Sequence, residues 1–377
     1  MENLKFHIAQ FGTYDIESLG DTSFPKMLQY GLEKYIFCEI ELFSMTECEA
    51  PYNDNSHVYS FEQFHERHAV KPFDAVIIGG GEFLHFSKMD VIINGVQRAY
   101  PEGYIWKKPL EMAAEYHIPA YFNCVGVPYD LTRSQQHELR DLMKAVCYVS
   151  VRDEYSAKRL RTAGIHSVYC VADNLWYMNE MYPKLQLMKL RHELELRTAR
   201  DFTTPYFIVQ YGTTRDAKSL AQQLLRLKEE TGYRICLMPV NYCHEDRVGM
   251  EMLVQLGQGQ FEAINDYLQP PEMMAVISGA KGFFGTSLHG NLTAASYGVP
   301  FVAIDMYPSF VSKMDGIFLA MGREQYLVPN EDSVKAAYDS LINDVAAPLT
   351  LANRIQEMQN MLDIHFRRMA DILKGDN

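Results

Sequence analysis

A run of small polar residues around a histidine is the segment of this sequence best suited to chemistry. Thr286 and Ser287 follow a short apolar run. His289, Gly290 and Asn291 then lead into a stretch of small residues that reads as a helix. Hydroxyls and free amides at the start of a helix bind anions, and an imidazole there can transfer protons or hold a phosphate. The alternative interpretation is that Thr286 and Ser287 cap the helix and that His289 is a buried, satisfied histidine.

Three consecutive glycines end another apolar run. Gly79, Gly80 and Gly81 are followed by Glu82. Such glycines let a ligand or a neighbouring backbone come close and expose amides to an anion, but a tight turn explains them equally well. The spacing does not fit GxGxxG, and the sequence contains no GxxxxGK[ST] motif.

The loop after the first apolar run is a third candidate. It contains Gly12, Thr13 and Tyr14, and Asp21 follows shortly after. In a doubly wound domain this loop faces the ligand. Asp21 therefore either contributes to a ligand site or caps the next helix.

Arg152 and Asp153 link a predicted strand to a predicted helix. Asp153 is placed as an N-cap or first-turn acid. The guanidinium of Arg152 could grip a carboxylate or phosphate, or it could pair with Asp153 or another acid.

A possible metal site follows a later strand, at His244, Glu245 and Asp246. A histidine and an aspartate at that spacing could hold a metal, but no third ligand is evident. A loop in which Asp246 acts as a cap is favoured instead, and we expect no metal.

The elements that position these residues alternate between short apolar runs and helix-like stretches. This alternation predicts an α/β protein with two doubly wound, Rossmann-like domains facing a cleft. Residues 185–200, rich in Leu, Glu, Lys and Arg, predict a connecting helix. The expected divisions are an N-terminal domain at 1–178, a linker helix at 179–205, a C-terminal domain at 206–345 and a C-terminal helix at 346–377.

Composition excludes several classes of protein. Of the 377 residues 47% are apolar and 22% charged, as in soluble globular proteins. The net charge of −13 argues against a nucleic-acid partner. No apolar run approaches the roughly 18 residues of a membrane span, and the N-terminus lacks the features of a signal peptide. Seven cysteines without a CxxC pair fit a reducing compartment, so we expect a cytoplasmic protein.

The order of these segments resembles the polysaccharide pyruvyl transferase family. The segments that carry the resemblance are residues 11–14 with 20–21, 77–81, 150–153, 171–173, 286–290 and 298–300. The resemblance implies a GT-B-like fold whose C-terminal helix crosses back to the first domain. It also implies transfer of a pyruvyl group from phosphoenolpyruvate to two hydroxyls of a sugar, giving a cyclic ketal and phosphate. No metal or redox cofactor is implied.

Site residues follow from the same resemblance. Its histidine and its first-domain arginine correspond to His289 and Arg152, and Asp21 or Glu82 is expected as the base. Ketal-forming members have an arginine where this chain has Ser287, so Arg215 or Lys281 is expected to help hold the anionic donor. The full set of expected substrate-binding residues is Gly12, Thr13, Tyr14, Gly80, Gly81, Glu82, Arg215, Lys281, Thr286, Ser287, Gly290 and Asn291.

The implied acceptor is a sugar or oligosaccharide of a cell-surface polysaccharide or its precursor, free or lipid-linked. A lipid-linked acceptor would place the protein peripherally at the inner membrane face. Two alternatives use the same fold: a glycosyltransferase with a nucleotide-sugar donor, and a non-catalytic glycan-binding relative.

Overall fold

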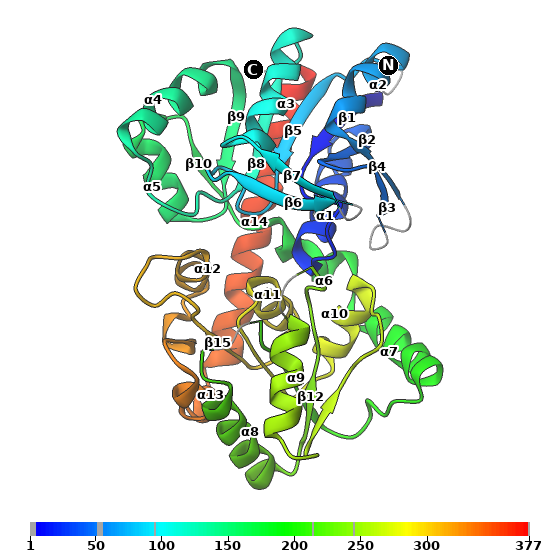
Figure 1. Cartoon of the computed structure of the whole chain (residues 1–377), viewed down its shortest axis with the longest axis vertical. Helices are drawn as coiled ribbons and strands as arrows, with labels where there is room; N and C mark the ends of the chain where they lie inside the picture. Colours follow the sequence, from blue (N-terminus) through cyan, green and yellow to red (C-terminus); the bar gives the residue numbers. More distant parts are fainter. Residues whose placement is uncertain (1–4, 51–55, 94–95, 213–214, 244–245, 376–377) are drawn as a thin grey trace. The chain divides into compact units, whose positions relative to one another are not determined.

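Two separate sheets form from the alternating apolar runs, one in each of two units of the chain (Figure 1). The computed structural model describes residues 5–50, 56–93, 96–212, 215–243 and 246–375. Unit 1 comprises Met1–Ile16, Asp21–Asn174 and Met358–Asn377. Unit 2 comprises Glu17–Gly20 and Leu175–Glu357, so a short piece from near the N-terminus belongs to it.

The sheet of unit 1 has the strand order β10-β9-β8-β5-β1-β2-β4-β3. Every neighbouring pair is parallel except β3 with β4. β1, β5 and β8 lie in the middle and are buried along almost their whole length, as expected for strands covered on both faces. The strands are β1 (Lys5–Phe11), β2 (Phe37–Ser44), β3 (Cys48–Ala50), β4 (Ser56–Ser60), β5 (Ala75–Gly79), β8 (Ala120–Val125), β9 (Val146–Val151) and β10 (Tyr169–Cys170).

Aromatic side chains fill one side of this sheet. Phe43 stacks on Phe11 with ring centres 5.0 Å apart, and Phe64 stacks on Phe73 at 5.2 Å. Large buried rings supply much of the apolar area that stabilises such a layer. The helices of unit 1 are α1 (Leu19–Glu33, whose first two residues belong to unit 2), α2 (Phe64–Val70), α3 (Tyr104–Glu115), α4 (Arg133–Leu142) and α5 (Glu154–Thr162).

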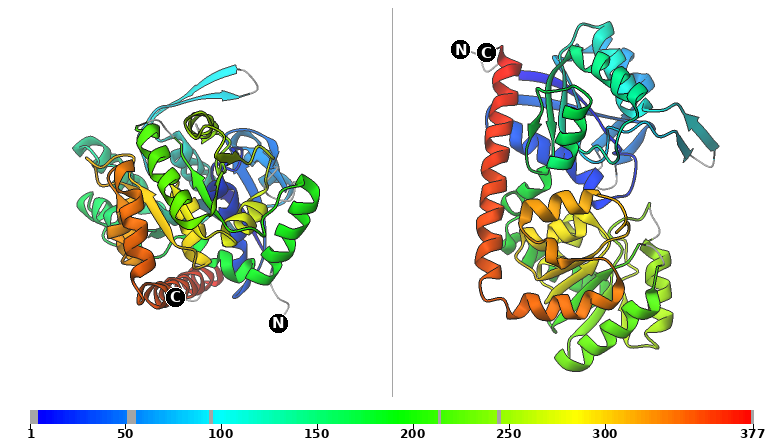
Figure 2. Two further views of the ribbon diagram at one scale, coloured as in Figure 1. Left: turned by 90° about the horizontal axis from the view of Figure 1, so that it is seen from below. Right: turned by 90° about the vertical axis from the view of Figure 1, so that its left-hand side faces the viewer.

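A two-stranded hairpin stands apart from the main sheet. It consists of β6 (Met89–Ile93) and β7 (Val96–Tyr100), which pair with each other in antiparallel fashion. Figure 2 shows the hairpin extending away from the rest of unit 1. The sequence interpretation did not predict it.

The sheet of unit 2 is parallel throughout, with the order β13-β12-β11-β14-β15-β16. Its strands are β11 (Tyr206–Gln210), β12 (Arg234–Leu237), β13 (Phe261–Ala263), β14 (Gly282–Gly285), β15 (Phe301–Ile304) and β16 (Leu327–Val328). Its helices are α6 (Met178–Met181), α7 (Lys184–Thr198), α8 (Ala217–Thr231), α9 (Asp246–Leu256), α10 (Pro270–Ser278), α11 (Leu288–Ser296), α12 (Lys313–Met321) and α13 (Val334–Asn343). The long helix α14 (Ala347–Lys374) starts in unit 2, and its residues from Met358 onward belong to unit 1.

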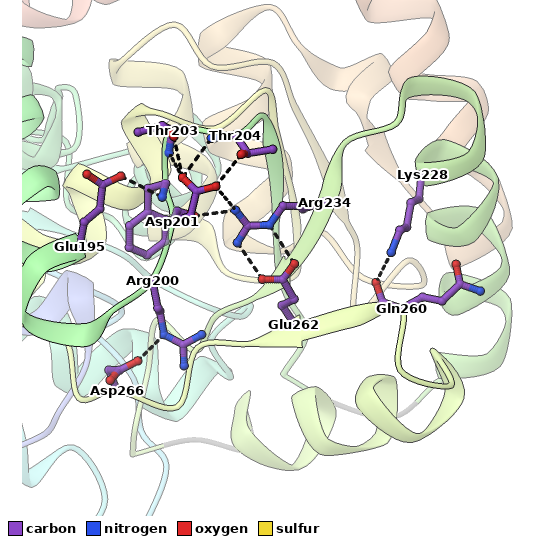
Figure 3. Close-up of polar contacts among 11 residues, drawn as sticks. Glu195, Arg200, Asp201, Thr203, Thr204, Lys228, Arg234, Gln260, Glu262 and Asp266 are labelled. Carbon is purple, nitrogen blue, oxygen red and sulfur yellow. Dashed lines mark hydrogen bonds and ion pairs between the residues drawn. The ribbon is translucent and has the colours of Figure 1, made fainter.

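A polar network fixes the amino-terminal edge of the second sheet (Figure 3). Arg234, the first residue of β12, donates two hydrogen bonds to Glu262 on β13, at 2.8 and 2.7 Å. It also donates to the carbonyl of Asp201 at 2.6 Å. The carboxylate of Asp201 in turn accepts bonds from Thr203 and Thr204, which lowers its pKa. The network ties the loop before β11 to the sheet, at the edge opposite the strands' carboxyl ends.

The α/β class and the two parallel sheets agree with the sequence prediction, while several boundaries differ. The helix expected to follow Asp21 already begins at Leu19, whose amide bonds to the carbonyl of Val240. The predicted connecting helix forms as α7, inside unit 2, where Arg197 pairs with Glu272 at 2.7 Å. Among the described residues, none of the helices combines the length and apolar character that a membrane crossing requires.

Candidate functional site

Gln210 organises the carboxyl edge of the sheet in unit 2. It is the last residue of β11 and is almost fully buried. Its Oε1 accepts hydrogen bonds from the Ser287 amide at 2.7 Å and the Thr286 hydroxyl at 3.4 Å. Its Nε2 donates to Asp246 at 2.9 Å. One amide side chain therefore holds the turn between β14 and α11 against the start of α9.

The N-terminus of α11 is the segment in which the sequence predicts an anion site. Ser287 is the N-cap, and its hydroxyl accepts a bond from the Gly290 amide at 3.3 Å. Thr286 accepts a bond from the Gly212 amide at 3.2 Å. Both side chains are half-buried, at the end of a helix that carries a partial positive charge. The capping interpretation of Ser287 is confirmed.

His289 lies in the first turn of α11 and is half-buried. Its ring lies against the backbone of Gly20, where a Cβ atom would fall 1.8 Å from Nδ1. Glycine is therefore required at residue 20 for this position of the imidazole. Gly20 belongs to the short N-terminal piece of unit 2, so this contact lies within one unit.

Asp246 helps to hold the segment that carries Gly20. Its Oδ2 accepts bonds from the amides of Val240 and Asn241 at 3.0 and 2.9 Å. Asn241 then accepts a bond from the Ser18 hydroxyl at 3.0 Å. Asp246, the first residue of α9, thus fixes the loop that precedes the helix; His244 and Glu245 lie outside the described residues.

The two cations proposed to replace the missing arginine differ in placement. Arg215 donates to the carbonyls of Asp305 and Pro329, both at 2.6 Å, and so links the loops after β15 and β16. Lys281 precedes β14 and lies at the amino end of that strand. Thr286 follows the carboxyl end of the same strand. That Arg215 or Lys281 helps to hold the donor stays a prediction.

Asn291, also expected to bind substrate, supports the turn from within. It is fully buried, and its Nδ2 donates to the carbonyls of Gly285 and Ser287 at 3.1 and 2.8 Å. The side-chain amide therefore satisfies carbonyls at the end of β14.

In unit 1, the glycine loop and the first loop come together. Gly79, Gly80 and Gly81 all have positive φ, and a Cβ at Gly80 would fall 2.2 Å from the ring of Phe24. Close packing thus explains Gly80. A Cβ at Gly81 would fall 3.3 Å from a carboxylate oxygen of Asp21.

Asp21 is not the cap of α1. It lies in the first turn, and its Oδ1 accepts a bond from the Thr13 hydroxyl at 2.8 Å. Tyr14 is buried and donates to the carbonyl of Gly79 at 3.1 Å. Burial raises the pKa of Tyr14 well above its usual value, so this phenol stays protonated. A Cβ at Gly12 would overlap that ring.

Arg152 is buried inside unit 1. Its Nη1 lies 3.1 Å from a carboxylate oxygen of Asp173, and both side chains are almost completely buried. Burial alone would lower the pKa of Arg152, but Asp173, Glu82 and Asp153 raise it. The structure thus pairs Arg152 with an acid, and Asp153 serves as the N-cap of α5 through the Ser156 amide at 2.7 Å.

Glu82, at the end of the glycine loop, lies beside this pair. A Cβ at Gly126 would fall 3.4 Å from Arg152 Nε and equally close to Cγ of Glu82. The structure therefore brings together Glu82, Arg152 and Asp173 in unit 1. His289 belongs to unit 2, and its placement in one pocket with Arg152 stays a prediction.

Sequence reasoning missed Gln210 and Asp173 as site residues. Gln210 is a polar residue that ends an otherwise apolar strand, and this pattern in the sequence could have identified it as a site residue. Asp173 lay in a recognised segment but could be paired with Arg152 only in three dimensions.

A group of potential metal ligands lies in unit 1, away from these residues. His7, Glu39 and Glu41 have ligand atoms within 4.8 Å of one another. Glu41 is bound by Arg67 at 2.8 and 2.9 Å, and Glu39 by Lys71 at 2.8 Å. These cations compensate the carboxylates, so the group does not carry a metal-site assignment.

A family model described as polysaccharide pyruvyl transferase matches residues 12–306. No curated protein matches the sequence.

Solved structures similar to the chain share its fold. A UDP-GlcNAc 2-epimerase from Neisseria meningitidis, bound to UDP-GlcNAc, is 11% identical with a TM-score of 0.62, covering 99% of both chains. A glycosyltransferase from Rickettsia africae is 10% identical with a TM-score of 0.62, covering 99% of this chain and 98% of its own. An Anabaena protein in complex with UDP and glucose is 9% identical with a TM-score of 0.59, covering 98% and 100%. At this identity the likeness shows the fold alone, and it confirms the GT-B class.

Proposed function

Because the chain belongs to the polysaccharide pyruvyl transferase family and is thus a transferase, we propose that phosphoenolpyruvate is its donor. The pyruvyl group goes to two hydroxyls of one sugar in a cell-surface polysaccharide or its precursor. The observation that carries the proposal is the start of α11, where Thr286, Ser287 and the Gly290 turn surround a helix N-terminus beside His289. Such a terminus suits the phosphate or carboxylate of this donor.

The reaction balances without any further reactant. A proton adds to the methylene carbon of phosphoenolpyruvate, and a sugar hydroxyl bonds to the central carbon as it loses its own proton. The second hydroxyl then bonds to the same carbon, and the carbon–oxygen bond to phosphate breaks. The phosphate leaves with the proton of that hydroxyl, and the product is a cyclic ketal.

His289 is the proposed general acid for the methylene carbon. An imidazole changes protonation near neutral pH and is therefore suited to this transfer. Asp21 or Glu82 in unit 1 is the proposed base for the acceptor hydroxyl. Tyr14 is unsuited to that role because burial keeps it protonated.

Charge for the donor comes from a limited set of groups. Ser287 stands where an arginine is expected, and its hydroxyl is committed to the cap. Arg215 remains the proposed cation of unit 2, because its two close partners are neutral carbonyls and Glu331 lies 3.9 Å away. The helix terminus adds about half a positive charge.

The test is incubation of the protein with phosphoenolpyruvate and a panel of glycans. We expect release of inorganic phosphate that depends on the glycan, together with a glycan product carrying the mass of a ketal. A matched incubation with nucleotide sugars is the control. Transfer of a sugar in that arm, without phosphate release in the first, would replace this proposal with glycosyl transfer.

The proposed setting is the cytoplasm, with an acceptor that is free or lipid-linked. Seven cysteines without a disulfide among the described residues support a reducing compartment. Cell fractionation that recovers the activity outside the cytoplasmic and inner-membrane fractions would contradict this setting.

A further inference from the structure

The loop between β15 and α12 exposes two aromatic rings. Tyr307 is 63% exposed and Phe310 is 73% exposed, and Val311 beside them is also exposed. Leaving a large apolar side chain in water forgoes the free energy of burial. Neighbouring exposed apolar residues of this kind mark interaction sites on folded proteins.

Other exposed aromatic residues in the described part of the chain have ring or cation partners. Tyr267 stacks on Tyr242 with ring centres 4.9 Å apart, and Tyr169 stacks on Tyr148 at 5.0 Å. Lys5 lies over the ring of Phe37. Neither Tyr307 nor Phe310 has such a contact among the described residues, and most of each side chain is exposed to a ligand.

The loop is held firmly at both ends. Arg215 donates to the carbonyl of Asp305, and the carboxylate of Asp305 accepts the Tyr307 amide at 2.9 Å. The Phe310 amide donates to the carbonyl of Tyr307 at 2.9 Å. At the far end, Ser312 caps α12, and its amide bonds to Asp315 at 2.7 Å. A fixed loop presents its rings without a large loss of entropy on binding.

The position of the loop connects it to the candidate site. It follows the carboxyl end of β15, which pairs with β14, and β14 ends in the turn at Thr286 and Ser287. In Figure 1 the loop leads into α12 of unit 2. Ligands of open α/β sheets bind outside the carboxyl ends of the strands.

We propose that Tyr307 and Phe310 form a platform on which a sugar ring of the acceptor glycan stacks. This inference rests on the proposed function, because the glycan is an acceptor only if the protein transfers a group to it. Glycan binding itself can be measured without turnover. Sugar rings present apolar C–H faces that fit aromatic faces, and polar groups such as Ser309 can reach their hydroxyls. An anionic lipid surface fits less well, because residues 305–312 contain no basic residue, Lys313 begins α12, and the net charge is −13.

The test compares Tyr307→Ala, Phe310→Ala and the double variant with the intact protein. The matched control is Phe37→Ala, which removes a 56% exposed ring from unit 1. Saturation-transfer NMR against the glycan panel measures binding without the donor, and steady-state kinetics measures KM for the best glycan. We expect about a tenfold weaker glycan affinity in the double variant, with KM for phosphoenolpyruvate and thermal unfolding unchanged.

The outcomes separate the two proposals. Glycan binding that is lost in the platform variants supports the platform even if no ketal forms, in which case the proposed function fails. Ketal formation with unchanged glycan affinity in the double variant overturns the platform and leaves the function standing. Three further results would overturn the platform. The intact protein binds no glycan, Phe37→Ala loses as much glycan affinity as the double variant, or the platform variants lose only the binding of phosphatidylglycerol vesicles.

Discussion

Gly20 lies so close to the imidazole of His289 that a methyl group at residue 20 would fall 1.8 Å from Nδ1. The ring is therefore positioned by a backbone surface from a distant part of the chain. That backbone is held by the Leu19 amide, which bonds to Val240.

Gly20→Ala should reduce turnover through His289. The added methyl group must displace the ring, and a misplacement of about 1 Å costs on the order of 100-fold in kcat. Steady-state kinetics of ketal formation measures the loss. The control is a double-mutant cycle: in a His289→Ala background the same change should add little. An equal loss in both backgrounds would mean that Gly20 acts independently of His289.

His289→Ala should lower kcat by about 100-fold or more, with KM for phosphoenolpyruvate nearly unchanged. The reason is that a general acid acts in the transition state and contributes on the order of 10²–10⁴ to the rate. A rise in KM alone would show instead that His289 only grips the phosphate.

Gln210→Leu should destabilise unit 2 and weaken donor binding together. The change removes the acceptor of the Ser287 amide and the donor to Asp246, and an unsatisfied buried group costs about 1–3 kcal/mol. Urea unfolding and KM for phosphoenolpyruvate are the measurements. Gln223→Leu, at another buried glutamine of unit 2, is the matched control and should leave KM unchanged.

Arg152→Ala should cost about 3–5 kcal/mol of the free energy of unfolding, because it leaves Asp173 buried without its cation. Urea unfolding at neutral pH measures this loss. Replacing Arg152 and Asp173 together with leucine should recover most of the stability. If Arg152 instead binds the donor, as one interpretation of the sequence has it, the expected result differs. Arg152→Lys would then raise KM for phosphoenolpyruvate while the fold stays intact.

Stability should fall in acid through His365. This residue of α14 lies in the core of unit 1, where its ring nitrogens are 2.9 Å from the Tyr148 hydroxyl and 2.8 Å from Asn123 Oδ1. Burial, with a smaller effect of Arg368, lowers the pKa of His365 to about 3. Between pH 6.5 and about 3 the unfolded chain binds the proton and the folded chain does not. The contribution of this group therefore decreases as pH falls, by about 1.4 kcal/mol per unit.

The measurement is urea unfolding at several pH values from 7 to 4, for the parent and for His365→Phe. Comparing the two removes the effect of other titrating groups. If the free energy of unfolding changes with pH in the same way for both proteins, His365 is not the cause of the loss of stability in acid.

Local signals in the sequence were enough to place the capping residues Ser287 and Asp153 and most of the strands. These features depend on a few neighbouring residues. The start of α1 and the contact between Gly20 and His289 depend on partners more than 200 positions away, so no local pattern could reveal them.

The partner of Arg152 illustrates a different limit. Asp173 was visible in the sequence, and pairing it with Arg152 required knowing that β9 and β10 are neighbours. The buried aromatic layer and the hairpin β6–β7 likewise follow from tertiary packing and strand pairing.

The division of the chain has a consequence for synthesis on the ribosome. Unit 2 needs Glu17–Gly20, which emerge before most of unit 1, and unit 1 needs Met358–Asn377, which emerge after the rest of unit 2. The pocket for His365 between Tyr148 and Asn123 stays unfilled until α14 has been made. Unit 1 must therefore wait for the synthesis of α14 before it reaches its final state. A nascent chain stalled shortly before His365 should expose an incomplete core to chaperones and proteases.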